Sequence, residues 1–449
     1  MNGDRPRRLL ALAVAGAVAV AFADSSIVVL ALPDLYSRFD TSIVGVSWVI
    51  TSYNLVLAVC ALALVPVLRR VEVSNLSRAG LLVFGGGSIG SAVSGSLPAL
   101  IVFRCVQGAG AAMLLAGSLA LLSALYGSRA RGLAVWIAAG TFGAALGPAL
   151  GGILTQLFDW RAIFVFQAPV ALVALVAAIE AHSHPSVGSG ATRRMAPNLS
   201  LGLLFGALVG ALFLAVLMLV SVWGASPIGG AATVSALPAA AFVAHRFAGE
   251  LSARTAAGAG AALLASGLVA LALLPATSVV IVILALALCG TGMGLAVPVL
   301  TRRAVAPDHG LVHDGTVTIG ARHLGLVLAL VLVAPVLSHD LQQGSRDALL
   351  GGTKALLNAD IPIQQEVPIV LDLRTVVAHA PRGTVPDLAE PFNKRGAAND
   401  MRLRQTRDSV VGALQDALTR SFRRALALCA LLAALALGPI LLARRSGVG

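Results

Sequence analysis

The sequence predicts an all-α membrane protein with twelve transmembrane helices in two pseudo-symmetric six-helix halves. Of its 449 residues, 58% are apolar and only 12% are charged. Apolar runs of about 20 residues, the length that crosses a bilayer as a helix, recur along most of the chain. Arginines cluster between these runs, and a linker rich in helix breakers divides the runs into two sets.

The twelve predicted spans begin close to the N-terminus. They cover residues 8–32, 44–67, 79–98, 99–124, 133–157, 162–181, 200–222, 227–247, 255–276, 278–300, 316–337 and 422–443. The first run resembles a signal peptide, because arginines precede it and Ala21, Phe22 and Ala23 resemble a cleavage site. The run continues past Asp24 to Pro33, which favours an uncleaved helix.

The arginines predict the orientation, because positive charge in short loops marks the cytoplasmic side. With a cytoplasmic N-terminus, the short outer loops receive only Arg38 and Arg161. The inner side receives Arg5, Arg7, Arg8, Arg69, Arg70, Arg78, Arg129, Arg131, Arg193, Arg194, Arg246, Arg254, Arg302, Arg303, Arg444 and Arg445. We therefore expect a multi-pass protein of a bacterial inner membrane with both termini cytoplasmic. This topology also accounts for the net charge of +12, so no nucleic-acid partner is expected.

Residues 182–199 are predicted to be a cytoplasmic linker, because histidine, glycine, proline and arginine replace the apolar residues there. The linker separates an N-terminal half, residues 1–181, from a C-terminal half, residues 200–449.

An internal echo agrees with this division. Gly108 and Gly110 in the fourth span recur as Gly290 and Gly292 in the tenth. Equivalent helices of repeated halves would show such a correspondence.

One long hydrophilic stretch, residues 339–421, lies between the last two spans and is expected outside the cytoplasm. Its ends predict helices that continue the flanking spans, whereas five prolines predict loop or short extended segments in its middle. One interpretation is a passive cap. The other is an element that docks an extracytoplasmic protein partner or guides substrate. The mixed-sign charge favours the passive cap.

Three charged residues lie within apolar spans, where charge is costly and usually functional. They are Asp24, Arg104 and Arg322. Asp24 and Arg104 are expected at similar depth, so a direct pair is plausible, whereas Arg322 is expected on the cytoplasmic side of the midplane. Ionising a carboxyl group is costly in a low-dielectric cavity, so protonation of Asp24 could be linked to conformation. The alternative for all three is a structural ion pair or a head group that reaches the membrane surface.

The fifth span carries Gly143, Gly147 and Gly151, one every four residues. Such a stripe permits close helix packing. A functional interpretation adds that the stripe is a moving seam between the halves, with Pro148 supplying a kink.

Uncharged polar residues in spans supply further candidates for a substrate cavity. Gln107 would hydrogen-bond either substrate or a neighbouring helix, and Tyr53 and Asn54 are weaker candidates.

Metal and enzyme chemistry are disfavoured. His309 and His313 lie beside Asp308 and Asp314, but a solvated cluster in a loop explains them better than a metal site. We see no nucleophile triad and no phosphate-binding loop, so neither an enzyme nor a cofactor is expected.

Six stretches, together with Trp160 and Arg161, carry a family resemblance. They are DSSIVVLALP at 24–33 with WVITSY at 48–53, RCVQGAGAA at 104–112, GAALGPALGG at 143–152 with Trp160 and Arg161, GTGMG at 290–294, and GARHLG at 320–325. Together they resemble the drug:proton antiporter branch of the major facilitator superfamily, including its fourth-helix signature R-x-x-Q-G-x-G-A and fifth-helix signature G-P-x-x-G-G. The resemblance implies the major facilitator fold and proton coupling at Asp24 and Arg104.

Two loops depart from that family. After its second helix the family reads G-x-L-a-D-R-x-G-R, whereas VPVLRRVE at 65–72 has Arg69 in place of the aspartate. The matching loop, GELSAR at 249–254, also lacks the aspartate. Because these loops are thought to latch the cytoplasmic gate, gating here is expected to use other pairs or to be altered.

The expected function is secondary active transport. Few charges line the spans, which favours proton-coupled export of an apolar or amphipathic small molecule by alternating access, with membrane lipid, protons and substrate as partners. One alternative is a lipid or lipid-conjugate exporter that works with an extracytoplasmic partner. Another is a non-transporting membrane scaffold or sensor, suggested by the missing gate aspartates.

Overall fold

The computed structural model describes residues 4–180, 194–274, 277–305, 310–357, 367–373, 375, 389–395, 397 and 400–442, and the regular elements in these ranges are helices. The first set is α1 (Asp4–Ile27), η1 (Val28–Ala31), α2 (Leu32–Arg38), α3 (Ile43–Leu64), η2 (Val67–Arg69), α4 (Val73–Ala92), α5 (Leu97–Leu125), α6 (Arg129–Leu157) and α7 (Arg161–Glu180). The second set is α8 (Met195–Val216), η4 (Leu217–Val222), α9 (Pro227–Val234), α10 (Ala236–Phe247), α11 (Ala253–Ala272), α12 (Val279–Ala304), α13 (Leu311–Leu357), α15 (Glu390–Asn393), α16 (Met401–Ser421), α17 (Arg423–Leu435) and α18 (Leu437–Leu442).

Serine side chains start many of these helices. In six cases the residue before the helix is a serine whose hydroxyl accepts a hydrogen bond from a backbone N–H of the first turn, which satisfies one of the otherwise unpaired donors. These serines are Ser42, Ser96, Ser128, Ser226, Ser252 and Ser278. The boundary between the third and fourth spans was predicted between residues 98 and 99. In the structure α4 ends at Ala92 and α5 begins at Leu97, directly after Ser96.

Each predicted span coincides with one helix or with consecutive helices. Within the described residues, ten helical stretches are long and apolar enough to cross a membrane, or eleven if the bent α6 counts as one. α4 is not among them because glycine and serine replace much of its apolar content. α8 begins at Met195, five residues before the predicted seventh span and within the predicted linker. The rest of that linker, up to residue 193, lies outside the described residues.

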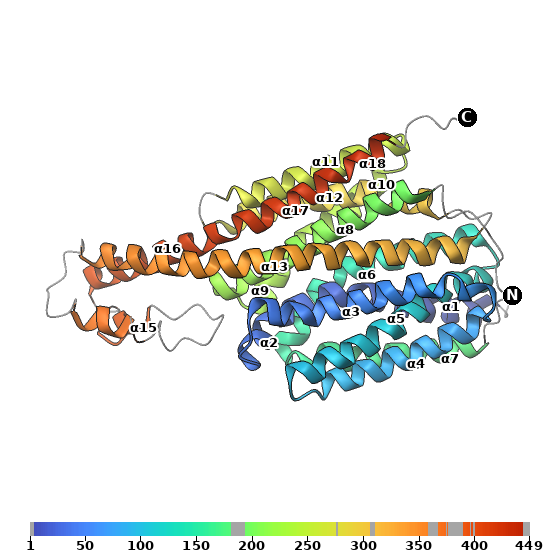
Figure 1. Cartoon of the computed structure of the whole chain (residues 1–449), viewed down its shortest axis with the longest axis horizontal. Coiled ribbons are helices and arrows are strands. Elements are labelled where there is room, and N and C mark those ends of the chain that lie inside the picture. The colour runs from blue at the N-terminus through green and yellow to red at the C-terminus, as the bar shows by residue number, and fades with distance from the viewer. Residues whose placement is uncertain are drawn as a thin grey trace.

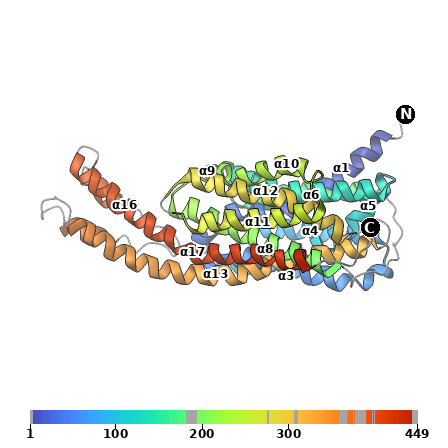
Figure 2. The same cartoon turned by 90° about the horizontal axis from the view of Figure 1, so that it is seen from above.

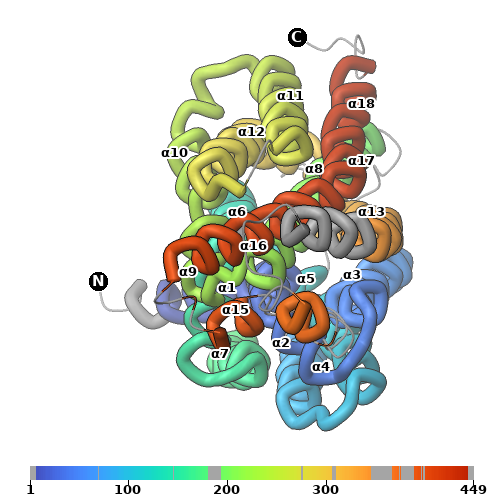
Figure 3. The backbone as a smooth tube through the Cα atoms, turned by 90° about the vertical axis from the view of Figure 1, so that its left-hand side faces the viewer, coloured from blue at the N-terminus to red at the C-terminus, as the bar shows by residue number. Residues whose placement is uncertain are grey.

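The helices run roughly side by side along the long axis of the molecule (Figure 1). Seen along that axis, α10, α11, α12 and α17 lie on one side and α3, α4, α5 and α7 on the other (Figure 3). The two groups meet where α13 packs against α3 and α5, and where α6 packs against α9. Both cavities described below lie between these groups.

The glycine echo has a structural counterpart. A Cβ on Gly108 would collide with the backbone of α3, and one on Gly110 with the backbone of α4. Likewise, a Cβ on Gly290 would collide with α10, and one on Gly292 with α11. Each glycine therefore permits a close helix contact. In each pair the first glycine meets the earlier helix, α3 or α10, and the second glycine meets the later one, α4 or α11.

α13 and α16 extend beyond the bundle at the end opposite α18 and the first turns of α1 (Figures 1 and 2). Their helical conformation agrees with the prediction of helical ends for residues 339–421. The two helices also pack against each other. The predicted loop in the middle is partly wrong, because residues 367–373 are helical and α15 contains Pro391 in its first turn, where proline is favoured.

Candidate functional site

Asp24 lies near the end of α1 and has no exposed surface. Its carboxylate accepts a hydrogen bond of 2.8 Å from Nη1 of Arg104 on α5 and a second bond from Nη2. Gln167 on α7 donates to the same carboxylate at 2.9 Å, and Gln107 on α5 donates at 3.4 Å. The predicted pair is therefore formed, and it is surrounded by amide donors.

Arg104 is also fully buried, and its other contacts fix its guanidinium in place. Nε donates to the backbone oxygen of Val49 on α3 at 2.8 Å. The guanidinium carbon lies 4.3 Å from the ring centroid of Tyr53 and 5.5 Å from that of Phe164. A buried ion pair keeps its charges only when further hydrogen bonds satisfy both partners, and this pair meets that condition.

An amide network extends the pair through the first group of helices. Gln107 accepts a bond of 2.6 Å from Nη1 of Arg104, and its amide nitrogen donates to Ser88 on α4 at 2.8 Å. The same nitrogen contacts Oε1 of Gln167. Gln107 thus hydrogen-bonds neighbouring helices. Gln167 was not among the predicted site residues; its signal is an amide inside an apolar span.

Tyr53 and Asn54 take structural positions beside this network. The Tyr53 hydroxyl donates to the backbone oxygen of Ala21 at 2.9 Å. Asn54 Oδ1 accepts a bond of 2.8 Å from Ser25 on α1 and lies 2.6 Å from Nδ1 of His323 on α13. Asn54 therefore connects α1, α3 and α13, and His323 is a second residue that the sequence prediction did not single out.

Arg322 does not join the Asp24 pair. Its side chain has 5% of its surface exposed, and its guanidinium carbon lies 4.3 Å from the ring centroid of Phe22 and 3.8 Å from that of Phe205. Nε of Arg322 has no hydrogen-bond partner among the described residues. Such aromatic stacking is worth about 2 kcal/mol when desolvated, whereas burying a cation costs several kcal/mol, so stacking alone leaves the charge undercompensated.

The glycine stripe of α6 packs against α1, which corrects the predicted seam between the halves. A Cβ on Gly143 would collide with Ala19, one on Gly147 with the Ser26 hydroxyl, and one on Gly151 with Ile27. Gly152 instead faces Ala231 and Pro227, so it is the glycine that approaches the second group of helices.

The predicted kink at Pro148 is present. Arg129–Ala144 and Leu146–Leu157, the two parts of α6, are inclined by 43°. Proline cannot donate to the carbonyl four residues earlier, which is that of Ala144. The Ser26 hydroxyl donates to this oxygen at 2.8 Å, so α1 satisfies the carbonyl that the kink leaves free.

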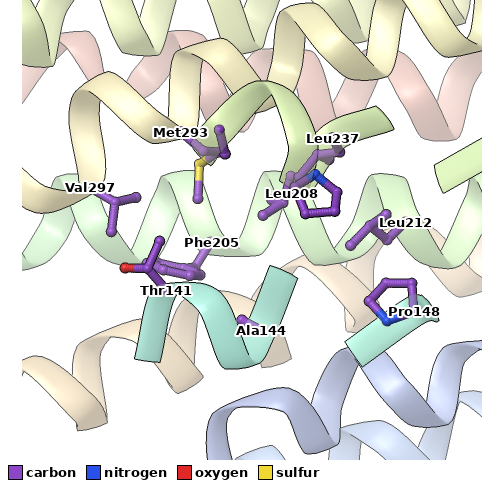
Figure 4. A pocket seen from close by; sticks show the side chains of 11 residues that line it. Thr141, Ala144, Pro148, Phe205, Leu208, Leu212, Leu237, Met293 and Val297 are labelled. Atoms are coloured by element: carbon purple, nitrogen blue, oxygen red, sulfur yellow. The ribbon is translucent and has the colours of Figure 1, made fainter. Parts of the chain in front are cut away.

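Two cavities lie between the two groups of helices. The first, about 40 Å³, is lined by α6, α8, α10 and α12 through residues such as Thr141, Phe205 and Met293 (Figure 4). The second, about 30 Å³, is lined by Phe22, Ser25, Ser26, Ala144, Phe205, Leu208, Val209, Leu212, Arg322, His323 and Leu326. They share Ala144, Phe205, Leu208 and Leu212. Neither Gln107, Tyr53 nor Asn54 lines these cavities, whereas Arg322 and Pro148 do.

A family model described as Major Facilitator Superfamily matches residues 14–306. The chain belongs to the major facilitator superfamily. This is a family of membrane transporters rather than enzymes, and the predicted fold is confirmed.

Relatives of this superfamily member include resistance proteins of bacteria. The chain is 36% identical over 158 residues to the methylenomycin A resistance protein of Bacillus subtilis (strain 168), a match that covers 34% of each chain. It is 32% identical over 217 residues to the multidrug resistance protein Stp of Mycobacterium tuberculosis (strain ATCC 25618 / H37Rv), covering 48% of this chain and 40% of that one. The matches thus span well under half of these relatives.

Solved structures extend the likeness along the whole fold. A bacterial homologue of the human lysosomal transporter Spinster, in an inward-facing and occupied conformation, has a TM-score of 0.67 at 16% identity, with 98% of this chain and 97% of that chain covered. The D-xylose–proton symporter has a TM-score of 0.60 at 13% identity, with 72% and 89% covered.

The loop after α3, which departs from the family's pattern, takes part in apolar packing. Val312 of α13 packs in one buried cluster with residues of the loop after α3 and of α4 and α5, namely Leu68, Val73, Leu76 and Ala116. Glu72, in the same loop, bonds Ser74 and Asn75. Asp314 of α13 pairs instead with Arg194, beside α8. These contacts connect α13 with the loop after α3 and with α4, α5 and Arg194.

The weak metal candidate is not assembled in the described part of the chain. His313 lies 3.6 Å from Asp314, whose other oxygen contacts Arg194, while Asp308 and His309 lie outside the described residues. No group of three metal-ligating side chains occurs among the described residues.

Proposed function

We propose that the chain is a secondary active transporter that exports an apolar or amphipathic small molecule in exchange for protons, by alternating access. The observation that carries this proposal is the buried carboxylate of Asp24, which is bound by Arg104 and lies next in sequence to Ser25, a residue that lines a central cavity. Membership of the superfamily and the position of that cavity between two groups of helices support transport.

The proton step follows from the contacts of Asp24. In its ionised form the carboxylate holds Arg104, which also bonds Val49, so α1, α3 and α5 are tied together. Protonation removes the negative charge and weakens both bonds to Arg104. α1 then becomes free to shift, and it carries Ser25 and Ser26 with it. A change of protonation is thereby converted into a change at the cavity wall.

The substrate class follows from the cavity walls. Leucine, phenylalanine, methionine and valine predominate, as expected for a site that binds apolar surface. The names of the two relatives, both resistance proteins, favour export over uptake. Cytoplasmic termini, as the arginine clusters predict, belong to the same proposal.

The test is transport in liposomes that contain the purified protein, with a panel of fluorescent amphipathic compounds and a pH-sensitive dye. Under an imposed pH gradient, the wild type should move at least one compound and move protons in the opposite direction. Asp24→Asn should lose gradient-driven transport while still inserting. Asp159→Asn, at an acid with half of its side chain exposed, is the matched control and should keep it.

Equal gradient-driven transport by wild type and Asp24→Asn would reject the proposal. Absence of compound-dependent proton flux across the whole panel would favour a non-transporting scaffold or sensor.

A second candidate is export of a lipid or lipid conjugate to an extracytoplasmic partner, and the paired extension of α13 and α16 favours it. Replacing residues 345–415 by a short glycine-serine linker keeps Asp340 and Thr419, which bond Arg424 and Trp223 within the bundle. If the extension hands cargo to a partner, this variant should fold but stop lipid export. A passive cap would leave both lipid and small-compound transport unchanged.

A further inference from the structure

The buried Arg322 has no counter-charge among the described residues. Neither a hydrogen bond nor an ion pair involves its guanidinium there, and the two groups that contact it closely are the rings of Phe22 and Phe205. A buried cation without an anion is unfavourable in any low-dielectric site, and intramembrane charges are usually retained for function.

The proton-coupling pair does not use this arginine. Asp24 is already bonded by Arg104, Gln107 and Gln167. The other buried acids among the described residues are Asp314, which is paired with Arg194, and Asp340, which is paired with Arg424. Arg322 is therefore available to a group that the protein itself does not supply.

Other polar side chains line the cavity together with Arg322. His323, whose Nε2 has no partner, and Ser25 and Ser26 line the same cavity. The neighbouring cavity shares Ala144, Phe205, Leu208 and Leu212 with this one, and it is lined almost wholly by apolar side chains such as Leu212 and Met293 (Figure 4). The two adjoining cavities thus present one cation and an extensive apolar wall.

We infer that Arg322 is the head-group subsite for an anionic amphiphile, that is, a carboxylate, sulfonate or phosphate group on an apolar body. The planar guanidinium binds such anions through two parallel hydrogen bonds. The rings of Phe22 and Phe205 contact the guanidinium without accepting conventional hydrogen bonds from it, so its N–H groups can donate to a ligand. This inference rests on the proposed function and names its substrate class.

The site is contracted in this structure. Cavities of about 30 and 40 Å³ each admit about one or two water molecules. Because the walls come from both groups of helices, separation of the groups enlarges the site. Binding of the anion should therefore favour an open conformation.

The experiment compares two probes that share one apolar body, 1-naphthaleneacetate and its neutral amide. Equilibrium binding is measured to the full chain in phosphatidylcholine nanodiscs, and empty discs give the background. The wild type should bind the acid more tightly than the amide. Arg322→Gln should lower the affinity for the acid by about tenfold and the affinity for the amide by less than about twofold. The affinity of Arg322→Lys for the acid should lie between those of the wild type and Arg322→Gln, because lysine keeps the charge but lacks the planar guanidinium.

Arg303→Gln, at an exposed arginine on α12, is the matched control and should bind both probes as the wild type does. If Arg322→Gln does not fold, Phe205→Leu provides the second test, because losing one ring should weaken the acid selectively. Equal binding of acid and amide by the wild type, or unchanged acid binding in folded Arg322→Gln, would overturn the inference.

One arm of the same experiment distinguishes the two possible sources of the anion, a lipid and a soluble organic acid. Phosphatidylglycerol in the discs should compete with naphthaleneacetate if the natural head group belongs to a lipid, and should have no effect if it belongs to a soluble organic acid. Acid binding is measured without a gradient, so a failure of gradient-driven transport in liposomes leaves this binding measurement intact. Failure of the anion site and failure of proton coupling are therefore distinguishable.

Discussion

The Asp24 carboxylate and the Arg104 guanidinium meet through two hydrogen bonds, one from Nη1 at 2.8 Å and one from Nη2. The residues come from α1 and α5, and both are completely buried. Each charge is therefore tolerable only because the other is present. This mutual dependence gives the first prediction.

Arg104→Gln should destabilise the protein by about 3–5 kcal/mol, because it leaves the Asp24 carboxylate buried without a cation. Adding Asp24→Asn should restore much of the loss, since two amides can hydrogen-bond without charge. Thermal unfolding of the purified variants in detergent measures both effects. Strictly additive losses in the double variant would show that the pair is not coupled.

The contact of α6 with α1 predicts an order among glycine substitutions. Gly143→Ala should be strongly destabilising, because its Cβ would meet the backbone of Ala19. Gly147→Ala should cost less, because its Cβ would first meet the Ser26 hydroxyl, and adding Ser26→Ala should recover part of that loss. Gly258→Ala, with open space around its Cβ, should be neutral or stabilising by up to about 1 kcal/mol.

Unfolding temperatures of these four variants check the order. Equal loss in Gly143→Ala and Gly258→Ala would contradict close packing of α6 on α1.

The bond between His323 and Asn54 joins α13 to α3, which belong to different groups of helices. His323→Ala should loosen this contact and increase amide hydrogen exchange in residues 50–58 and 316–326 by about tenfold. This increase corresponds to a decrease of about 1.4 kcal/mol in the free energy of local opening. His339→Ala is the control, because that histidine bonds Gln343 within α13. Unaltered exchange in both segments would mean that the bond does not hold the groups together.

Charge and apolar length made the fold and the Asp24–Arg104 pair predictable. A charge inside an apolar span is rare, and counting residues from span ends gives its depth. The resemblance of the motifs to the superfamily supplied the arrangement of the helices. The kink at Pro148 was likewise accessible, because a proline inside a helix has one main consequence.

The remaining features depend on partners that are distant in sequence. His323 and Asn54 are 269 residues apart, and no local pattern reveals that they meet. The direction of the glycine stripe was mistaken for a similar reason, because spacing identifies a flat face without identifying the helix that covers it. In the hydrophilic insert, Pro391 was interpreted as a breaker, although proline in the first turn of a helix is favourable.

The most direct test of the account is the number of protons released when a transported compound binds. Calorimetric titration of the reconstituted protein, in two buffers of different ionisation enthalpy, measures that number. When the titration is repeated over a range of pH, the wild type should release about one proton per compound in part of that range, and Asp24→Asn should release none. Equal proton release by the two proteins would contradict Asp24 as the coupling residue.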